Sequence, residues 1–527
     1  MNASPKSLEE ELLEIVAAAL ACGAADCGGP LSRAELALVR AAPPARAGAG
    51  RSIRSAIRDG RDPLGERLCA ARSRAQRRTL GAFYTPPEIV AAMIDWVFER
   101  LPSRLVDAGC GSGRFACAAA RRDRRLEIVA VDIDPLATLI ARAALAAAGA
   151  VNARVLTADY LRAPIGRTPG RTAFVGNPPY VRHHELTPET KARAAALAAE
   201  IGANVSGLAG LHVLFYLATL AVHGERGDVG SFVTSAQWLD VNYGSFLRDA
   251  FTGALGGCGL AAFDPRATPF ADAMTTAVIT TFCIGNRSRH VLLSLPGAAE
   301  SLTLERGRRC ERSVLARTAR WSALFRDDPS QTDTATIGTL FRVSRGQVTG
   351  ANGFFVMSKV TAQERGILPY CVPLVASAKE VLGAGGALRD APTRSVGLQI
   401  ASEAELFADE ALADYVRSGE RAQVHRGYVV SRRRPWYAVQ FPRPPIVATY
   451  MARGAPCFAR NPDELGLLNV VHGLYPRRPL DEATLERVVA SLNARRESFI
   501  GRGRTYQGGL EKFEPREMEA LPLELSS

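Results

Sequence analysis

Apolar and polar positions in the middle of the chain predict buried strands that alternate with amphipathic helices. Between residues 81 and 295, short apolar runs end in turn residues, which is typical of buried strands, and other apolar positions recur at helical spacing. The apolar runs are Leu105–Val106, Ile128–Val131, Val155–Leu156 and Ala173–Val175, and the helical positions include Met93, Ile94, Trp96 and Val97. This alternation predicts a doubly wound α/β domain over residues 81–295.

The flanking segments have other patterns. Residues 1–80 are predicted to be a helical segment, whose apolar stretch 11–22 is too short to span a bilayer. Residues 296–335 indicate a connector. Residues 336–527 combine short strand-like runs, turns and a helical end, which predicts a separate α+β domain. A chain of 527 residues is long enough for such a division.

Composition and charge narrow the functional classes. The chain is 47% hydrophobic, as expected of a soluble globular protein, and its net charge of +12 favours a polyanionic partner, although Arg-rich proteomes shift many proteins this way. The ten cysteines are scattered without a C-x-x-C pair, and residues 9–11 are acidic where a signal peptide would be basic. We therefore expect a reduced, cytoplasmic protein with no bound metal and no membrane segment.

A glycine-rich turn follows the first predicted strand. Gly109, Gly111 and Gly113 are spaced G-x-G-x-G, without the register of the dinucleotide fingerprint, and they allow close approach of the backbone to a ligand. Asp107, just inside the strand, would repel a pyrophosphate. It would suit a ligand with an ammonium group and no phosphate, such as S-adenosylmethionine.

Two further strand ends carry acids. Asp132 can accept hydrogen bonds from two ribose hydroxyls, whereas Asp134 is expected to cap the helix that begins at Pro135. Asp159 can accept from an adenine amino group, and the ring of Tyr160 can lie against the base. Together with the glycine turn, these residues predict a nucleotide-type site.

The fourth apolar run ends in Asn177-Pro178-Pro179-Tyr180. The Asn side-chain oxygen and a backbone carbonyl can accept hydrogen bonds from one planar amino group, and the two prolines fix φ and remove competing donors. The Tyr ring offers a face on which a flat base can stack.

These motifs resemble a known family once the segment before them is included. Residues 81–90 read Gly-Ala-Phe-Tyr-Thr-Pro-Pro-Glu-Ile-Val, and the order of all motifs resembles that of the gamma-class, TaqI-like DNA adenine-N6 methyltransferases of restriction–modification systems. The resemblance covers residues 81 to about 285, including the segments 230–239 and 269–279. It implies a Rossmann-like domain that uses S-adenosylmethionine, transfer of a methyl group to N6 of a flipped adenine in double-stranded DNA, and a C-terminal target recognition domain. A separate restriction endonuclease is a further expected partner, unless the chain is an orphan methylase.

The resemblance also implies roles for individual residues. The cofactor would be held by Tyr84, Thr85 and Pro86 at its methionine end, by Asp107, Gly109 and Gly111 along its length, by Asp132 at the ribose, and by Asp159 and Tyr160 at the adenine. The target base would be held by Asn177, Pro178, Pro179 and Tyr180, with Phe270 stacked on its other side.

Two basic stretches are candidates for contact with DNA. Residues 40–78 hold eleven arginines and three acids, and they could contact the DNA backbone or form a solvated helix that covers the catalytic domain. Residues 421–462 hold eight arginines, no acid and interleaved aromatics, a composition that favours phosphate and guanine contacts over a basic sheet face. The candidate DNA-binding residues are Arg345, Arg426, Arg432, Arg433, Arg434 and Arg504. The insert 181–210 is expected to be a mobile loop that orders on DNA.

Other functions are compatible with the same motifs. The fold could act on another amino or amide nitrogen, namely an RNA base, cytosine N4 or a protein glutamine, or the chain could be a non-catalytic DNA-binding subunit. The Tyr-Thr-Pro-Pro element and the basic C-terminal domain favour DNA, and the intact glycines, acids and Asn177 favour an enzyme. His183 and His184 lack accompanying ligands at metal-binding spacing, so we expect them to be loop residues. We expect a monomer.

Overall fold

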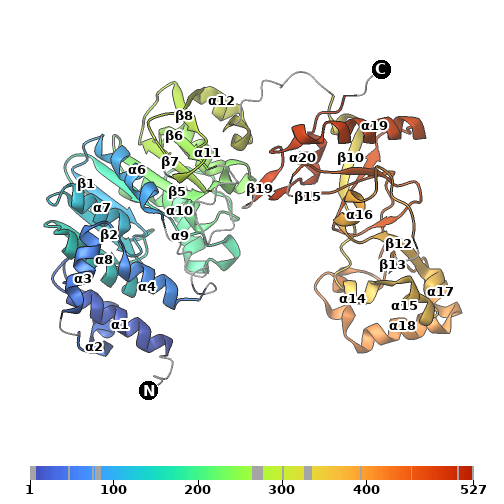
Figure 1. The fold of residues 1–527 in the computed structure, drawn as a ribbon, viewed down its shortest axis with the longest axis horizontal. Coiled ribbons are helices and arrows are strands. Elements are labelled where there is room, and N and C mark those ends of the chain that lie inside the picture. The colour runs from blue at the N-terminus through green and yellow to red at the C-terminus, as the bar shows by residue number, and fades with distance from the viewer. Residues whose placement is uncertain are drawn as a thin grey trace. The chain divides into compact units, whose positions relative to one another are not determined.

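The computed structural model describes residues 7–45, 48–73, 76, 85–263, 277–299, 302–325, 335–391, 394–452, 454–506 and 510–524. The chain divides into two compact units, Met1–Asp327 and Asp328–Ser527 (Figure 1). No helix within these described ranges has the length and apolar character needed to cross a membrane.

The first unit is built on a nine-stranded sheet in the order β3-β2-β1-β4-β5-β7-β6-β8-β9. The neighbours from β3 to β5 are parallel, and β7 runs antiparallel to β5 and β6. The strands are β1 (Arg104–Ala108), β2 (Glu127–Asp132), β3 (Ala153–Thr157), β4 (Thr172–Gly176), β5 (Val229–Ser235), β6 (Gly257–Ala262), β7 (Ala277–Cys283), β8 (His290–Ser294) and β9 (Arg308–Glu311). The expected doubly wound fold is confirmed.

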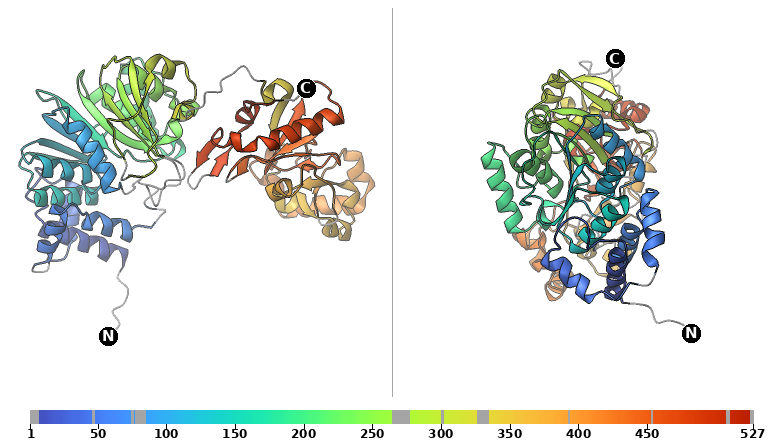
Figure 2. Two further views of the ribbon diagram at one scale, coloured as in Figure 1. Left: turned by 45° about the horizontal axis from the view of Figure 1, so that its top comes forward. Right: turned by 90° about the vertical axis from the view of Figure 1, so that its left-hand side faces the viewer.

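Helices cover both faces of this sheet (Figure 2). Leu105 of β1 packs with residues of α6, α7 and α8, whereas its neighbours Val106 and Ala108 face the opposite core with α9, α10 and α11. The helices are α6 (Pro87–Phe98), α7 (Arg114–Arg122), α8 (Pro135–Ala148), α9 (Pro188–Glu200), α10 (Leu211–Ala218), α11 (Ser245–Thr252) and α12 (Arg312–Arg317). A π-helical turn, Thr219–His223, continues α10.

Four N-terminal helices pack against α8 in the same unit (Figures 1 and 2). They are α1 (Leu8–Ala21), α2 (Arg33–Ala41), α3 (Ala49–Arg58) and α4 (Pro63–Ala71). A buried ion pair holds α2 to α8: Arg142 of α8 donates to Glu35 of α2 over 2.8 Å, and both side chains are at most 1% exposed. Arg142 also donates to the carbonyls of Cys27 and Gly29, at 2.8 and 2.7 Å. One arginine thus satisfies several backbone acceptors of the N-terminal segment.

Arginines of the basic N-terminal stretch are used inside the unit. Arg54 donates to the carbonyl of Ala21 and Arg58 to that of Ala147, at 2.6 and 3.1 Å. Such contacts support the interpretation that these helices cover the catalytic domain, rather than form an arm on DNA. Residues 74–75 and 77–84, which include part of the stretch, lie outside the described residues.

The insert 181–210 is not the loop that its composition suggested, because most of it is helical. Thr187 caps α9 by accepting from the backbone N–H of Thr190, and Pro188 occupies the first turn. Ala194 and Leu197 are buried against the core. Apolar residues at helical spacing therefore outweigh the small and charged residues around them.

The second unit is α+β, with a final helical part, as expected. Its sheets have the orders β10-β18-β14-β16, β11-β13-β12-β17 and β15-β20-β19. The strands are β10 (Phe341–Arg345), β11 (Val356–Ser358), β12 (Cys371–Val375), β13 (Ser395–Leu398), β14 (Ile446–Ala448), β15 (Met451–Ala452), β16 (Phe458–Arg460), β17 (Gly466–Leu467), β18 (His472–Pro476), β19 (Arg504–Tyr506) and β20 (Leu510–Lys512). The helices are α13 (Ile337–Leu340), α14 (Asn352–Phe355), α15 (Lys359–Glu364), α16 (Ala378–Leu382), α17 (Glu403–Ala408), α18 (Glu410–Arg421), α19 (Glu482–Ala494) and α20 (Pro515–Glu519).

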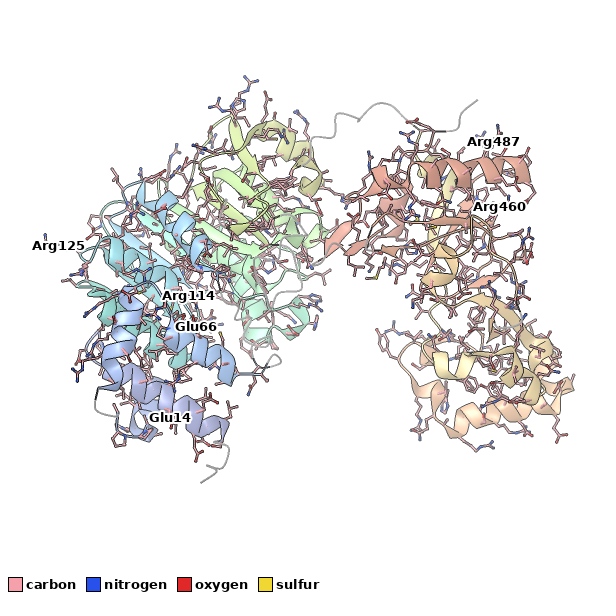
Figure 3. The ribbon with its side chains drawn as sticks, viewed as in Figure 1. Glu14, Glu66, Arg114, Arg125, Arg460 and Arg487 are labelled. Carbon is pink, nitrogen blue, oxygen red and sulfur yellow. The ribbon has the colours of Figure 1, made fainter. Side chains whose placement is uncertain are left out.

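A buried arginine joins a sheet to a helix in this unit too. Arg460 of β16 pairs with Glu482 at the start of α19 and donates to the carbonyl of the same residue over 3.1 Å (Figure 3). The residues of α19 that face the sheet are Leu485, Val488, Val489 and Leu492.

We predict that Glu35→Ala destabilises the first unit by about 3–5 kcal/mol, because the substitution leaves the charge of Arg142 buried without its partner. Urea unfolding measures the loss. Asp59→Ala is the control, since Asp59 pairs with Arg61 at the surface over 3.7 Å and its loss should cost less than about 1 kcal/mol. Equal effects of the two variants would contradict the assigned role of the buried pair.

Candidate active site

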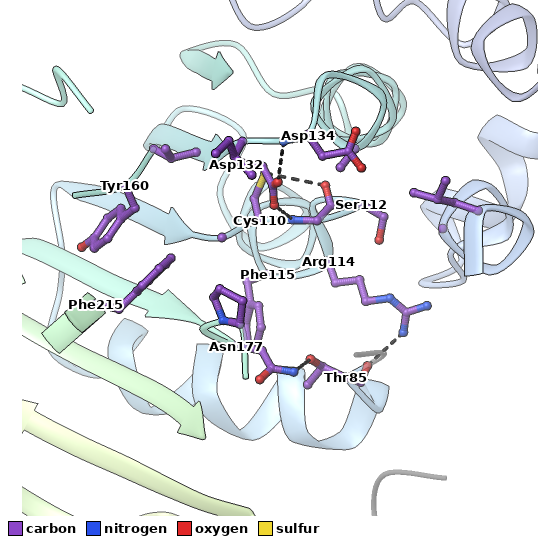
Figure 4. Close-up of a pocket in the computed structure, with 18 of the residues that line it drawn as sticks. Thr85, Cys110, Ser112, Arg114, Phe115, Asp132, Asp134, Tyr160, Asn177 and Phe215 are labelled. Atoms are coloured by element: carbon purple, nitrogen blue, oxygen red, sulfur yellow. Dashed lines mark hydrogen bonds between the residues drawn. The ribbon is translucent and has the colours of Figure 1, made fainter. Parts of the chain in front are cut away.

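A cavity of about 190 Å³ lies at the carboxyl ends of β1, β2 and β4, where the turns that follow these strands meet (Figure 4). The predicted residues that line it are Thr85, Gly109, Gly111, Asp132, Asp159, Tyr160, Asn177 and Pro179. The sheet order therefore brings together residues from five separate motifs. This is the crevice in which open α/β sheets bind ligands.

The glycine turn takes a backbone shape that favours glycine. Gly109, Gly111 and Gly113 have φ values of 70°, 52° and 81°. The turn is held by Asp132, whose Oδ2 accepts from the N–H of Gly111 at 2.8 Å (Figure 4). Asp134 caps α8 by accepting from the N–H of Leu136 at 3.0 Å, as its place before Pro135 predicts.

Asp132 lines the cavity and can accept further hydrogen bonds from a ligand there. Each of its oxygens accepts one backbone N–H, from Gly111 and from Asp134, and a carboxylate oxygen can accept a second bond. Burial raises the pKa of Asp132, the nearby Asp134 adds to the rise, and the two N–H donors oppose it. A ligand hydroxyl that donates to this carboxylate would compensate its burial.

Asp107 lies beneath the turn and does not line the cavity. It is fully buried and accepts from the N–H of Ala116 in α7 at 2.9 Å. Burial raises its pKa to about 7, the nearby Asp132 charge adds to the rise, and the Ala116 N–H opposes it. In this structure Asp107 anchors the start of α7 and so supports the turn from below.

The far side of the cavity is aromatic and apolar. The ring of Tyr160 stacks on Phe215 of α10 with centroids 4.8 Å apart (Figure 4). The Tyr160 hydroxyl lies 2.9 Å from Oγ1 of Thr219 in the π-helical turn. Ile133, which is 67% exposed, lines the same cavity. Phe215 and Ile133 were not identified from the sequence, although a large apolar residue directly after a strand-end acid was a signal for Ile133.

Asn177 and Thr85 are in direct contact. Nδ2 of Asn177 donates to Oγ1 of Thr85 at 3.1 Å, and Arg114 of α7 donates to the carbonyl of Thr85 at 2.9 Å (Figure 4). Because the two heteroatoms of an amide lie on opposite sides of its carbon, this bond directs Oδ1 of Asn177 away from Thr85. The segment before α6 thus fixes the orientation of the Asn177 side chain.

Helix α4 forms a further wall of the cavity through Gly65, Leu68, Cys69 and Arg72. Arg72, at its end, pairs with Asp134 over 2.6 Å, and Asp62, at its start, accepts from Nε of Arg114 at 2.7 Å. Gly65 permits this approach, since a Cβ there would lie 2.6 Å from Oγ of Ser112. No sequence motif indicates this wall.

Tyr180 is half-buried beside the cavity and packs edge-on against His212 of α10, with centroids 6.1 Å apart. Burial raises the pKa of the Tyr180 hydroxyl. His212 is 6% exposed, and its two ring nitrogens have no hydrogen-bond partner among the described residues. Burial lowers the pKa of His212 to about 4, so the ring is neutral at physiological pH.

The remaining predicted residues of the site fall in different places. Pro178 is buried, and Pro86 is the residue directly before α6; neither lines the cavity. Tyr84 and Phe270 lie outside the described residues. Among the residues that the structure does describe, no group of three or more His, Cys, Asp or Glu side chains could hold a metal ion.

The predicted DNA-binding arginines lie in the second unit, and their side chains differ in exposure. Arg426, Arg432 and Arg434 are exposed, and Arg432 lies 4.1 Å from the ring centroid of Tyr428, a residue that is 74% exposed. By contrast, Arg433 is half-buried and donates to the carbonyl of Val348 at 2.6 Å.

Arg345 pairs with Glu514, and the side chain of Arg504 is not described. Arg432 and Arg434 also donate within their own segment, to the Tyr428 hydroxyl and to the carbonyls of Ser431 and Arg433. The feature that separates Arg426, Arg432 and Arg434 from Arg433 is therefore the exposure of their side chains, which leaves them able to contact a polyanion.

Comparisons with known proteins match both units. Residues 317–526 match the family model of the type II methyltransferase M.Eco57I C-terminal domain, and residues 91–201 match the methyltransferase small domain. The type II methyltransferase M.XamI of Xanthomonas campestris pv. amaranthicola is 39% identical over 470 residues, which cover 87% of this chain and 86% of the relative.

A more distant sequence relative and a solved structure are also similar to this chain. The type II methyltransferase M.AccI of Acinetobacter calcoaceticus is 22% identical over 84% of this chain and 85% of its own length. Among solved structures, the type IIL restriction–modification enzyme MmeI in complex with DNA has a similar fold, with a TM-score of 0.58 at 14% identity over 86% of this chain and 70% of MmeI.

The raised pKa of Asp107 predicts a pH-dependent stability. Its unfolded-state pKa is near 3.8, so between about pH 4 and pH 7 the unfolded chain loses a proton that the folded protein keeps. Raising the pH through this window therefore removes stability from the wild type, by up to about 4 kcal/mol at roughly 1.4 kcal/mol per pKa unit.

Asp107→Asn keeps an acceptor for the Ala116 N–H but does not titrate. The difference in unfolding free energy, variant minus wild type, should rise from pH 4 to pH 7 in urea unfolding experiments. Asp59→Asn, a neutralised surface acid, provides the control. If the difference in unfolding free energy between Asp107→Asn and the wild type stays constant from pH 4 to pH 7, the raised pKa of Asp107 is contradicted.

Proposed function

The chain belongs to the type II DNA methyltransferases of restriction–modification systems, and from that premise we propose that it methylates the exocyclic N6 of a flipped adenine at a specific DNA site. The observation that carries this proposal is the position of Asn177, which reaches the same cavity as Asp132, Asp159 and the glycine turn. An amino-group acceptor and a nucleoside site thus share one cavity.

The cofactor of this family is S-adenosylmethionine, and the residues of the cavity fit it. Asp132 would accept from the ribose hydroxyls and Asp159 from the adenine amino group, with the apolar side chains of Ile133, Tyr160 and Phe215 around the base. When bound, the cofactor supplies an electrophilic methyl group on its sulfonium.

The protein's part in the reaction is to orient an amino nitrogen. Oδ1 of Asn177 would accept one hydrogen of the target amino group. The resemblance implies that the carbonyl of Pro178, a residue that does not line the cavity in this structure, accepts the other. These two bonds would draw the nitrogen lone pair out of conjugation with the ring. With the cofactor bound, the nitrogen would attack the methyl carbon in line with the carbon–sulfur bond, which would break and leave the sulfur as a neutral thioether. The methylated nitrogen would then lose its extra proton to solvent. Positioning and electrostatics supply most of the rate, so no strong base is needed.

A base inside a duplex cannot reach this cavity, and flipping is therefore part of the proposal. Extrusion of a base costs a few kcal/mol, which stacking on the ring of Tyr180 would offset. His212 packs edge-on against that ring and holds it from α10. The proposed second stacking residue, Phe270, lies outside the described residues.

The second unit supplies a candidate surface for DNA. Arg426, Arg432 and Arg434 are exposed on one short segment that also carries Tyr428. Arginine binds phosphates and can read guanine in the major groove. We propose that this segment contacts DNA, as part of a target recognition domain over residues 336–527.

The deciding experiment is methyl transfer from radiolabelled S-adenosylmethionine to unmethylated genomic DNA, with RNA and protein extract in parallel. We expect label in DNA that nucleoside analysis identifies as N6-methyladenine, and a loss of at least about 100-fold in Asn177→Ala, in line with removal of a transition-state hydrogen-bonding group.

Each other outcome contradicts a part of the proposal. Label recovered as N4-methylcytosine would keep the mechanism and change the base. Label confined to RNA or protein would keep the fold and cofactor and overturn the substrate. Full activity of Asn177→Ala would remove Asn177 from the reaction.

We also predict that replacing Arg426, Arg432 and Arg434 together by Gln flattens the salt dependence of DNA binding. The slope of log affinity against log salt should fall by about one unit for each phosphate that the variant no longer neutralises. The control replaces Arg389, Arg417 and Arg487, which are exposed in the same unit, and removes the same charge. Equal slopes for the two triple variants would exclude the proposed segment from the interface.

A further inference from the structure

A chain of hydrogen bonds runs from the N-terminal helices to Asn177. It begins at Asp62, the residue that caps α4: Oδ1 accepts from the N–H of Gly65 at 2.9 Å. Oδ2 accepts from the hydroxyl of Ser112 in the glycine turn and from Nε of Arg114. One carboxylate therefore joins α4, the glycine turn and the start of α7.

The chain continues through Arg114 and Thr85. Nη1 of Arg114 donates to the carbonyl of Thr85, and Oγ1 of Thr85 accepts from Nδ2 of Asn177 (Figure 4). Thr85 is 4% exposed, and the side chains of Arg114 and Asp62 are 14% and 13% exposed. Charge-assisted hydrogen bonds shielded from water in this way are strong and directional.

We propose that Asp62 is a positioning residue for methyl transfer, which acts through Arg114 and Thr85 on the amide of Asn177. This inference rests on the proposed role of Asn177. A guanidinium is a planar, rigid donor, so its pairing with Asp62 fixes the plane from which Nη1 reaches Thr85. Thr85 in turn fixes the direction of Oδ1, the atom that meets the target amino group.

The N-terminal helices do not need Asp62 in order to stay docked. The Glu35–Arg142 pair holds α2 to α8, and the Arg72–Asp134 pair holds the other end of α4. Removing the charge of Asp62 should therefore leave the fold in place and disturb the orientation of Arg114. The expected effect is on the reaction rather than on stability.

The test compares Asp62→Asn with the wild type at saturating S-adenosylmethionine and excess enzyme over a DNA site. Asn can still cap α4, but it cannot form a charged pair with Arg114. We expect a single-turnover rate lowered about 10- to 100-fold, the scale of a small misplacement of reacting groups, with unchanged DNA affinity. Asp59→Asn makes the same chemical change at an exposed position and should stay within about twofold of the wild type.

A double-mutant cycle distinguishes positioning from local support of the fold. If Asp62 acts through Thr85, then Thr85→Val and Asp62→Asn/Thr85→Val should have similar rates, because the connection is already broken in the single variant. Losses that multiply would overturn the proposal. A wild-type rate for Asp62→Asn would also overturn it.

A second variant covers the case in which Asp62→Asn lowers the melting temperature. The same cycle is then run with Arg114→Lys, since Lys keeps the charge and loses the planar fork. Again, multiplicative losses with Thr85→Val would refute the inference. Absence of methyl transfer in the wild type would refute the proposed function itself. The rates of the variants, in contrast, test only the role of Asp62.

Discussion

The parallel order β3-β2-β1-β4 is the constraint on which the site depends. Parallel strands end at the same edge of a sheet, so the turns after β1, β2 and β4 must meet there. Asp132 reaches across from β2 to hold the glycine turn after β1, and Asn177 emerges beside it from β4. No single motif forms the cavity; it forms because β1, β2 and β4 are neighbours in the sheet.

The N-terminal helices pack against α8 within the first unit, and a buried ion pair contributes to that packing. A fully buried ion pair is costly to desolvate, and it is retained here with extra hydrogen bonds from Arg142 to backbone carbonyls. The pair holds α2 to α8, whereas α4 is held against the glycine turn by the Arg72–Asp134 pair and by the bond from Ser112 to Asp62. The surface ion pairs of the chain contribute little by comparison.

Much of this arrangement could be predicted because its signals are local. The apolar runs, the glycine spacing and the strand-end residues Asp132, Asp159 and Asn177 lie next to the elements that position them. The wall formed by α4, the contact of Phe215 with Tyr160, and the link from Asp62 to Arg114 join residues far apart in sequence, and no local pattern encodes them. The position of Asp107 could have been predicted from strand geometry. Its side chain lies on the opposite face of β1 from Val106 and Ala108, so it faces α7 rather than α10. For α9, the small residues of the insert suggested a loop. The segment is a helix instead, because Leu197 packs into the core when it is helical.

The wall formed by α4 bears on how such enzymes can be recombined. A chimera whose junction lies at the Tyr-Thr-Pro-Pro element, residues 84–87, would separate Gly65 and Arg72 from the cavity that they line. In a chimera, the N-terminal helices and the sheet of the first unit would therefore have to be transferred together, as parts of one compact unit.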